Sequence, residues 1–365
     1  MAISYNMDRQ NLEPNDLARH IRDWGRELGF QAVGITDIDL SAAERRFLDW
    51  LKAGFHGDME YMARHGTRRS RPAELVEGTC RVISVRMDYR PAGAADADAV
   101  LADSRQGYIS RYALGRDYHK LMRKRLANLA RRIEAAVGPF DHRVFVDSAP
   151  VLEKPLAEKA GLGWVGKHSN LLHREGSWFF LGEIYVDLPL PVDTATEPHC
   201  GSCRACMDAC PTRAIVAPYA VDARLCISYL TIELRGSIPE ELRPLIGNRI
   251  YGCDDCQLCC PWNRFTANTA EGDFEPRHEL DSTSLVELFT WDKARFLQRT
   301  EGSAIRRLGH ERWLRNIAVA LGNAPSEPAI IEALQARREA CSPLVREHVE
   351  WALNQHGIAT SESAG

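Results

Sequence analysis

Residues 200–211 read CGSCRACMDACP, and residues 253–261 read CDDCQLCCP. The first stretch has the spacing C-x2-C-x2-C-x3-C-P, by which bacterial two-cluster ferredoxins bind [4Fe–4S] clusters. Three cysteines at this spacing bind one cluster, and the fourth, before the proline, reaches the neighbouring cluster. Structural zinc sites usually present two separated C-x2-C pairs, so the pattern favours iron–sulfur over zinc. The stretch therefore predicts a domain that carries electrons one at a time.

The cysteines outnumber the ligands that two clusters need. Nine of the eleven lie between positions 200 and 260, whereas two clusters take about eight. Cys259 and Cys260 compete for one position, because adjacent side chains seldom reach the same cluster. The Cys-Pro pattern favours Cys260, although spacing alone leaves Cys259 open. The expected ligands of one cluster are Cys200, Cys203, Cys206 and Cys260. The expected ligands of the other are Cys210, Cys226, Cys253 and Cys256.

The bulk composition is that of a soluble, multidomain protein. The 365 residues are 45% hydrophobic and 26% charged, and they exceed the length of a lone ferredoxin. Cysteines concentrated in one region indicate metal ligands and not a disulfide framework. The first residues, MAISYNMDRQNLEPND, lack the apolar segment of a signal peptide. No run approaches the roughly 18 apolar residues of a membrane helix. We expect a cytoplasmic protein that does not enter a membrane.

Positive charge is concentrated in two places, although the net charge is −4. Between Ser104 and Arg132 there are nine Lys and Arg residues and one acid, Asp117. A basic face on an acidic protein is typical of a surface that contacts a phosphate backbone. A solvated helix face would carry the same charges. The second basic group is Arg64, Arg68, Arg69 and Arg71.

The hydrophobic periodicity divides the chain into three parts. Residues 1–195 alternate between helical and strand patterns, which predicts a mixed α/β domain. The cysteine domain follows at 196–270. Three short helices after it, within 275–360, predict a HEAT-like stack that docks on the rest, because one or two such units could not stand alone. The helices expected in the first part cover 16–29, 41–54 and 120–138. The expected strands lie within 30–38, 81–89, 142–147 and 178–190, and 91–103 is expected to be irregular.

Asp147 is the catalytic candidate. It closes an apolar strand before the turn at Pro150, where open α/β folds place ligand-facing groups. A partly desolvated carboxyl there would have a raised pKa and could deliver a proton near neutral pH. The alternative is an N-cap of the helix that follows. The nearby GLGWVG, residues 161–166, follows a helical stretch, so we expect Gly161 to cap that helix and expect no dinucleotide site.

Three further stretches complete a family resemblance: DSAPVLEKPLAEKAGLGWVGKHSNLL (147–172), GSWFFLGEIY (176–185) and IRRLGHERWLRNIAVALGN (305–323). With the cysteine motif they resemble the epoxyqueuosine reductases, cobalamin-dependent iron–sulfur enzymes that complete queuosine synthesis in tRNA. The resemblance covers nearly the whole chain. It implies a cobalamin-binding α/β domain at 1–195, a two-[4Fe–4S] ferredoxin domain at 196–270 and a tRNA-facing HEAT-like domain at 275–360. It also implies that Asp147 is the proton donor, and it supports Cys260 as a cluster ligand.

The implied reaction removes an epoxide oxygen as water and leaves an alkene, which consumes two electrons and two protons. Two clusters would feed cobalamin one electron at a time, and an acid must stand beside the leaving oxygen. The implied partners are tRNA with a GUN-type anticodon that carries epoxyqueuosine and an external low-potential electron donor, and we expect a monomer. Residues of suitable type to line the cofactor or a flipped base are Arg111, Tyr112, Tyr118, His119, Lys167, His168, Ser169 and Asn170.

The lower face of the cobalamin is expected to lack a protein ligand. Asp117-Tyr118-His119 begins the D-x-H-x-x-G pattern that supplies such a His, but Met122 stands at the glycine position. Two other functions fit less well. A different cobalamin and iron–sulfur reductase, such as a reductive dehalogenase relative, would usually carry an export signal and need no basic stretches. A non-catalytic RNA-binding electron carrier would show no corrin absorption band.

Overall fold

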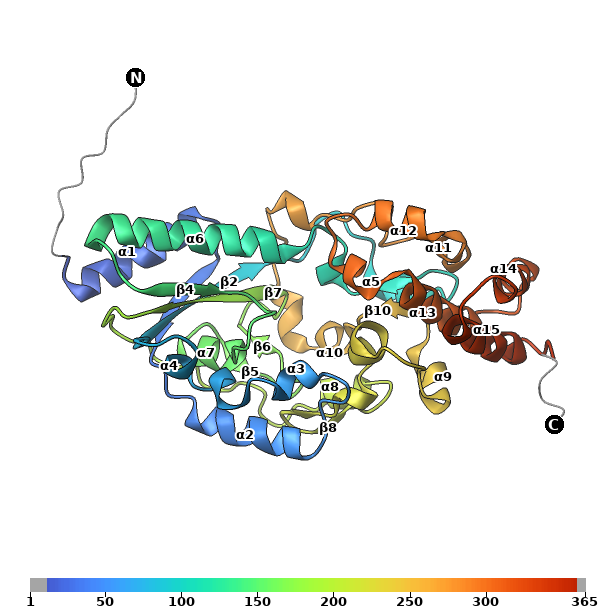
Figure 1. The fold of residues 1–365 in the computed structure, drawn as a ribbon, viewed down its shortest axis with the longest axis horizontal. Coiled ribbons are helices and arrows are strands. Elements are labelled where there is room, and N and C mark those ends of the chain that lie inside the picture. Colours follow the sequence, from blue (N-terminus) through green and yellow to red (C-terminus); the bar gives the residue numbers. More distant parts are fainter. Residues whose placement is uncertain (1–11, 360–365) are drawn as a thin grey trace, which may run out of the picture.

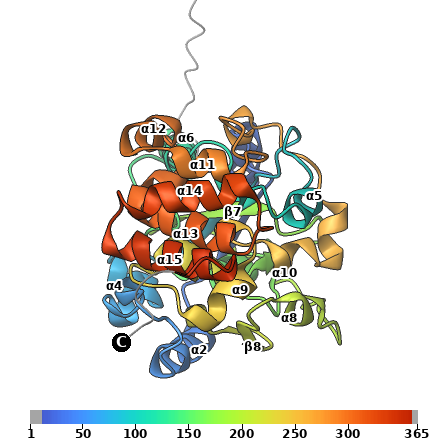
Figure 2. The ribbon, with the colours of Figure 1, turned by 90° about the vertical axis from the view of Figure 1, so that its right-hand side faces the viewer.

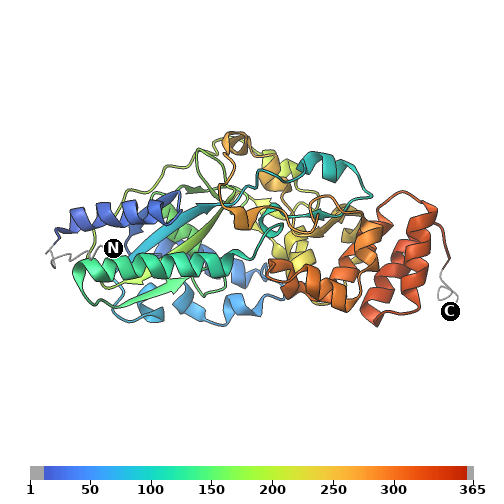
Figure 3. The ribbon, with the colours of Figure 1, turned by 90° about the horizontal axis from the view of Figure 1, so that it is seen from above.

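The computed structural model describes residues 12–359. Residues 1–11, part of the polar N-terminal stretch interpreted above, and residue 360, the last of the expected helical domain, lie outside the described residues. The molecule is elongated, with a sheet and its covering helices at one end and the C-terminal helices at the other (Figure 1, Figure 3). Within 12–359, every helix is too short or too polar to cross a membrane.

A four-stranded sheet, in the order β1-β2-β7-β4, forms the centre of the N-terminal part. Each neighbouring pair is antiparallel, so the rule that places ligands at the carboxyl ends of parallel strands does not apply to this sheet. The two central strands are almost continuously buried and apolar, because helices cover both faces. The strands are β1 (Ala32–Thr36), β2 (Arg81–Asp88), β4 (His142–Phe145) and β7 (Phe179–Val186).

Helices α1 (Pro14–Glu27) and α6 (Tyr118–Val137) cover one face of the sheet, and α7 (Glu153–Lys159) lies against the other (Figure 1). Helix α6 buries an apolar stripe at three- and four-residue spacing, as an amphipathic helix must. Asp117 caps its first turn by accepting a hydrogen bond from the backbone N–H of His119 at 3.1 Å. The stripe consists of Met122, Leu126, Leu129, Ile133 and Ala136.

The expected helices and strands of the first part are present, with α2 (Ser41–Lys52) between β1 and β2. Two local predictions were wrong. Residues 91–103 contain a helix, α5 (Ala97–Ala102), because the Asp96 carboxylate caps it by accepting a hydrogen bond from the N–H of Ala99 at 2.9 Å. Strand β4 ends at Phe145, two residues before the position expected.

The structure confirms the prediction that Gly161, the first residue of GLGWVG, follows the end of a helix. Helix α7 ends at Lys159, and Gly161 follows with φ +75°, a left-handed conformation that suits the residue after a helix. The motif then runs into a hairpin of β5 (Trp164–Val165) and β6 (Leu171–Leu172), not into a helix. The N-cap of α7 is Leu152, so Asp147 does not cap this helix.

The cysteine region contains only short elements, and its path is set mainly by turns. One of them, η4 (Tyr229–Glu233), is a π-helix, a rare form that occurs most often near functional sites. The others are short helices, short strands and 3-10 turns. They are α8 (Ala205–Ala209), β8 (Ile215–Ala217), β9 (Ala220–Val221), η3 (Ala223–Leu225), η5 (Glu240–Leu242), α9 (Arg243–Ile246), β10 (Arg249–Tyr251), α10 (Asp255–Leu258) and η6 (Pro261–Phe265).

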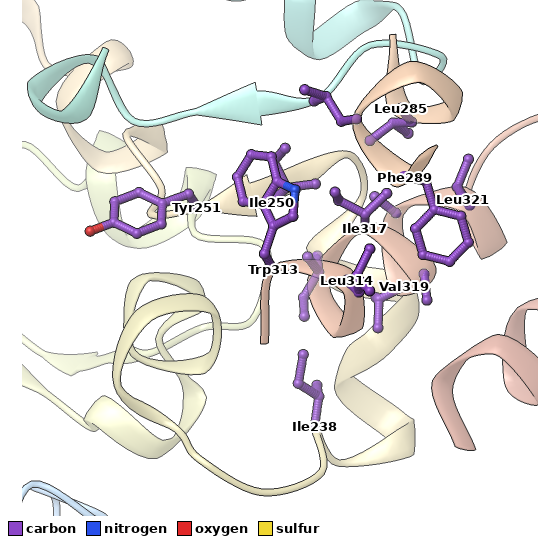
Figure 4. Close-up of a cluster of buried hydrophobic side chains, with 14 of the residues drawn as sticks. Ile238, Ile250, Tyr251, Leu285, Phe289, Trp313, Leu314, Ile317, Val319 and Leu321 are labelled. Carbon is purple, nitrogen blue, oxygen red and sulfur yellow. The ribbon is translucent and has the colours of Figure 1, made fainter. Parts of the chain in front are cut away.

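The C-terminal helices gather at the far end of the molecule (Figure 2). Helix α13 lies at their centre and packs against α15 and against β10 of the cysteine region. Trp313, Ile317 and Phe289 share one buried cluster with Ile250, so the helices and the cysteine region are parts of a single core (Figure 4). The helices are α11 (Leu285–Thr290), α12 (Lys293–Arg299), α13 (His310–Gly322), α14 (Pro328–Arg338) and α15 (Pro343–Gln355).

Two buried polar side chains of α13 hold the π-helix η4. The Arg315 guanidinium, fully buried, donates to the carbonyls of Leu230 at 2.7 Å and Leu234 at 2.8 Å. The Asn316 amide donates to the carbonyl of Thr231 at 2.8 Å. Because a buried guanidinium is costly unless its hydrogen bonds are made, these contacts fix α13 and η4 relative to each other.

Glu183, on β7, is a buried carboxyl on the face of the sheet toward α7. It is 0% exposed, and neither of its side-chain oxygens has a hydrogen-bond partner in the described part of the chain. Burial raises the pKa of Glu183 well above its usual value, and the charges of Glu153 and Asp147 add to this effect. The folded protein therefore keeps Glu183 protonated.

Replacing Glu183 with Gln is expected to flatten the pH dependence of stability. The folded protein binds the Glu183 proton more tightly than the unfolded chain does, so the free energy of unfolding falls as pH rises above the ordinary carboxyl pKa of 4.5. The slope reaches about 1.4 kcal/mol per pH unit, and denaturant titrations between about pH 5 and about pH 8 measure it. Equal slopes in the two proteins would contradict a protonated Glu183.

Candidate active site and cluster cavities

Asp147 lies in the loop between β4 and α7 in a left-handed conformation, with φ +37°. Such a backbone costs a non-glycine residue roughly 1 kcal/mol or more, so the surroundings must hold it. His119 Nε2 lies 3.2 Å from Asp147 Oδ2, and the Tyr118 hydroxyl donates a hydrogen bond to the same carboxylate. The Asp147 side chain stays 50% exposed because it faces a cavity.

His119 connects Asp147 to a second carboxylate. Its Nδ1 lies 2.7 Å from Asp117 Oδ1, and Arg307 donates to the other Asp117 oxygen at 2.5 Å. Burial alone would lower the pKa of His119, but the carboxylates of Asp117 and Asp147 outweigh burial and raise the pKa above its ordinary value of 6.5. With a carboxylate at each ring nitrogen, the imidazole is stabilised as the cation.

The prediction of a raised pKa for Asp147 was wrong. Burial does push the pKa upward, but the hydrogen bonds from His119 and Tyr118 outweigh burial and lower the pKa below its usual value. These opposite pKa shifts favour a charged Asp147 carboxylate beside a protonated His119. Half-buried Glu153, at the start of α7, has a pKa raised to about 7, mainly by burial and then by the charge of Asp147.

A cavity of about 530 Å³ lies between the sheet and the cysteine region and reaches Asp147. Its apolar wall includes Phe180, on which the Tyr118 ring stacks with centroids 3.8 Å apart. His168, 5% exposed, also lines it, and the His168 Nε2 has no partner within residues 12–359. The cysteines in the cavity wall are Cys210, Cys226, Cys253 and Cys256.

A second cavity, of about 240 Å³, lies at the first cysteine motif. Burial, followed by the neighbouring thiols of Cys260, Cys200 and Cys203, raises the pKa of Cys206 to about 11, so these sulfurs lie close together. Cys259 is not among the residues that line this cavity or the larger one. The cysteines in the wall of the second cavity are Cys200, Cys203, Cys206 and Cys260.

A third cavity, also of about 240 Å³, lies on the other side of Asp147. The third cavity and the large cavity adjoin, because they share the lining residues Tyr112, Tyr118, Asp147, Ile232 and Glu233. Basic side chains complete the wall of the third cavity. They are Arg235 after η4, Arg307 of the 3-10 turn η8 (Ala304–Leu308) and Arg312 of α13.

The residues expected to line a cofactor or base lie in four different places. His119 lines the third cavity beside Asp147. Arg111 lines none of these cavities, and its guanidinium donates to the carbonyl of Ala95 at 3.0 Å. Lys167 lines the second cavity, where its ammonium donates to the carbonyls of Gly201 and Cys203 in the first cysteine motif. Those that line the large cavity are Tyr112, Tyr118, His168, Ser169 and Asn170.

Sequence reasoning missed three charged residues of the site. Glu153 and Arg307 lie inside the stretches DSAPVLEK and IRRLGHERW, so the family resemblance contained a signal for them. Glu233 lies in none of the quoted stretches, and it comes to the same cavity wall as Asp147 only when the chain folds.

These features define an iron–sulfur redox enzyme, with two four-cysteine cavities and an acid–base group at the border of the larger one. Residues 69–148 match the family model "Epoxyqueuosine reductase QueG, DUF1730", and residues 199–263 match the "4Fe-4S double cluster binding domain". The chain belongs to the epoxyqueuosine reductase family.

It is 64% identical over 352 residues to the epoxyqueuosine reductase of Pseudomonas aeruginosa, covering 95% of this chain and 97% of that one. It is 62% identical over 345 residues to that of Escherichia coli, covering 94% and 90%.

Solved structures of this family share the fold. A crystal structure of an epoxyqueuosine reductase with an epoxyqueuosine-modified tRNA-Tyr stem loop matches with a TM-score of 0.84 at 26% identity, over 93% of this chain and 90% of that one. A structure of the Bacillus subtilis enzyme, described with an aspartate catalytic loop swung out of the active site, matches with a TM-score of 0.82 at 26% identity, over 93% and 90%.

The choice between Cys259 and Cys260 can be tested by metal content. Cys260→Ala is expected to lose one cluster, about four of about eight irons after anaerobic reconstitution. Cys259→Ala is the matched control and is expected to keep both clusters, because its thiol lines neither cysteine cavity. Iron and sulfide analysis with electron paramagnetic resonance of the reduced proteins measures the difference. The reverse result would assign Cys259 as the ligand.

Proposed function

We propose that this protein reduces epoxyqueuosine to queuosine at the wobble position of tRNAs with GUN-type anticodons. Cobalamin in the large cavity would receive electrons from two [4Fe–4S] clusters, and Asp147 would donate the proton. The observation that carries the proposal is the Asp147 carboxylate, 3.2 Å from His119 Nε2, at the border of a cavity lined by four cysteines. Membership of the family and the tRNA stem loop in a similar structure support it.

The residues of the large cavity suit a cobalamin, which has an apolar macrocycle and a rim of amide side chains. Phe179, Phe180 and Leu181 offer apolar contact. His168 Nδ1 accepts a hydrogen bond from the N–H of Asn170 at 3.1 Å, so its Nε2 carries the proton and can donate to an amide carbonyl. A protonated Nε2 does not coordinate a metal, which agrees with a cobalamin that has no protein lower ligand. Bound there, cobalamin would supply a reduced cobalt that delivers electrons to the epoxide.

The proton chemistry can be assigned to this chain's own residues. Opening the epoxide and releasing its oxygen as water takes two protons. Asp147 would receive the first proton from His119, whose pKa is raised by Asp117 and Asp147 against the effect of burial, and pass it to the oxygen. Glu153, with a pKa raised to about 7 by burial and by Asp147, is partly protonated at neutral pH and can supply the second.

Basic side chains near Asp147 suit a surface that binds the phosphate backbone of RNA. Arg123, on the exposed side of α6, donates to the Ser148 hydroxyl at 3.0 Å, next to Asp147. In the second basic group, Arg71 pairs with Glu44 at 2.9 Å and Arg69 is buried, so these two are not free for phosphate. Within the two basic groups, the exposed residues that form no ion pair with the described part of the chain are Arg64, Arg68, Lys120, Arg123, Lys124 and Arg131.

The remaining assignments follow from the same chemistry. Cys203 is exposed, so the first cluster would receive electrons from an external low-potential donor. Because the proposed substrate is tRNA, we propose that the enzyme acts in the cytoplasm, as a monomer. The three-domain division at 1–195, 196–270 and 275–360, with a HEAT-like C-terminal part that faces tRNA, is part of the proposal. The single core shared by the last two parts supports docking of the helices on the cluster domain.

Asp147→Asn is expected to lower kcat by roughly a hundredfold or more, the contribution of a general acid. His119→Gln is expected to lower kcat less and to change its pH profile. In the wild type the His119 pKa is raised, so the proton is present below that pKa and the rate falls as pH rises through it. The Gln variant should lack this alkaline limb. Conversion of epoxyqueuosine in tRNA from a reductase-null strain measures both effects.

Asp141→Asn is the matched control, because Asp141 is an exposed carboxylate on the turn before β4. It should leave turnover unchanged. A wild-type kcat in Asp147→Asn, with clusters and cobalamin bound, would contradict the assignment of the proton donor.

A further inference from the structure

A carboxylate without a partner stands where the large and third cavities meet. Glu233 lines both, and its side chain makes no hydrogen bond or ion pair within residues 12–359. Burial raises the pKa of Glu233, and Asp147 adds to this effect, while Arg312 and Arg235 oppose it. A half-buried carboxylate that lacks a donor is costly, so the position suits a ligand that supplies one.

The backbone that carries Glu233 is held firmly, so its free side chain does not reflect a loose loop. Glu233 is the last residue of the π-helix η4. The Arg312 guanidinium donates to the carbonyl of Ile232 at 2.9 Å, and Arg315 donates to that of Leu234 at 2.8 Å. Helix α13 therefore fixes the carbonyls on either side of Glu233 while leaving its carboxylate toward the cavities.

Other carboxylates near the third cavity are already engaged. Asp117 is paired with His119 and Arg307, and Asp147 accepts hydrogen bonds from His119 and Tyr118. Glu233 is thus the carboxylate of this wall that remains available to a bound cation.

The substrate of the proposed reaction carries such a cation. Epoxyqueuosine is a 7-deazaguanine whose aminomethyl linker joins an epoxycyclopentane diol, and its secondary amine is protonated at neutral pH. The amine is bonded to the ring carbon next to the epoxide. An epoxide presented to Asp147 therefore brings the ammonium within a few bond lengths of the same cavity wall, which Glu233 shares.

We propose that the third cavity receives the modified base and that Glu233 is a substrate-binding residue that pairs with its linker ammonium. This inference rests on the function proposed above. Charge-assisted hydrogen bonds of this kind are among the stronger contacts in recognition. The pair would place the epoxide beside Asp147, and it would distinguish a base that carries an amine from one that does not.

Binding of two modified anticodon stem loops measures the contribution of the positive charge, and it requires no turnover. One carries 7-aminomethyl-7-deazaguanine, a primary ammonium, and the other carries 7-cyano-7-deazaguanine, a neutral nitrile. The holoprotein is expected to bind the first about tenfold more tightly, the effect of one charge-assisted contact. In Glu233→Gln this preference should fall to about twofold or less, while Glu233→Asp, which keeps the charge, should retain part of it. Fluorescence anisotropy of labelled stem loops measures each Kd.

Glu240→Gln is the matched control. Glu240 is exposed on the same part of the chain, so this variant also removes one negative charge but should keep the wild-type preference. No preference in the wild type, or an undiminished one in Glu233→Gln, would overturn the inference. The proposed function is judged separately by turnover of the epoxyqueuosine stem loop in the wild type. Turnover together with a preference that survives in Glu233→Gln would overturn the role of Glu233 alone.

Discussion

The Asp147 carboxylate lies between two donors, Nε2 of His119 and the hydroxyl of Tyr118, and the rest of the site is arranged around this pairing. The two hydrogen bonds hold a left-handed residue in the loop after β4 and keep its carboxylate charged in a half-buried position. They also place a protonated imidazole directly behind the group that faces the cavity. In the proposed mechanism the pair acts as one acid, in which His119 holds the proton and Asp147 passes it to the substrate.

Parts of the chain that are far apart in sequence supply this acid. Helix α6 contributes Tyr118 and His119 from its first turn, and Arg307 reaches Asp117 from the turn before α13. The following helix holds the π-helix that carries Glu233 through Arg312, Arg315 and Asn316. Because α13 packs in the same core as the cysteine region, the C-terminal helices help to shape the site at their inner end.

Local signals in the sequence predicted the local features well. Cysteine spacing, together with the Cys-Pro pattern that favours Cys260, predicted two sets of four, and each set lines a cavity of its own. Hydrophobic periodicity located the helices and strands of the sheet domain. The charge state of Asp147 could not be predicted from the sequence, because it depends on His119, which α6 places beside the loop. The same limit applied to Arg69 and Arg71, whose charges are buried or paired, and to Glu233, which no motif marks.

The central claim is that Asp147 stands between a cofactor in the large cavity and a flipped base in the third cavity. A crystal structure of the cobalamin-loaded protein with an epoxyqueuosine-modified anticodon stem loop tests it most directly. We expect the corrin in the large cavity and the epoxide oxygen within hydrogen-bond distance of Asp147, with His119 still paired to that carboxylate. An epoxide oxygen that contacts a different acid, or a base that leaves the third cavity empty, would contradict it.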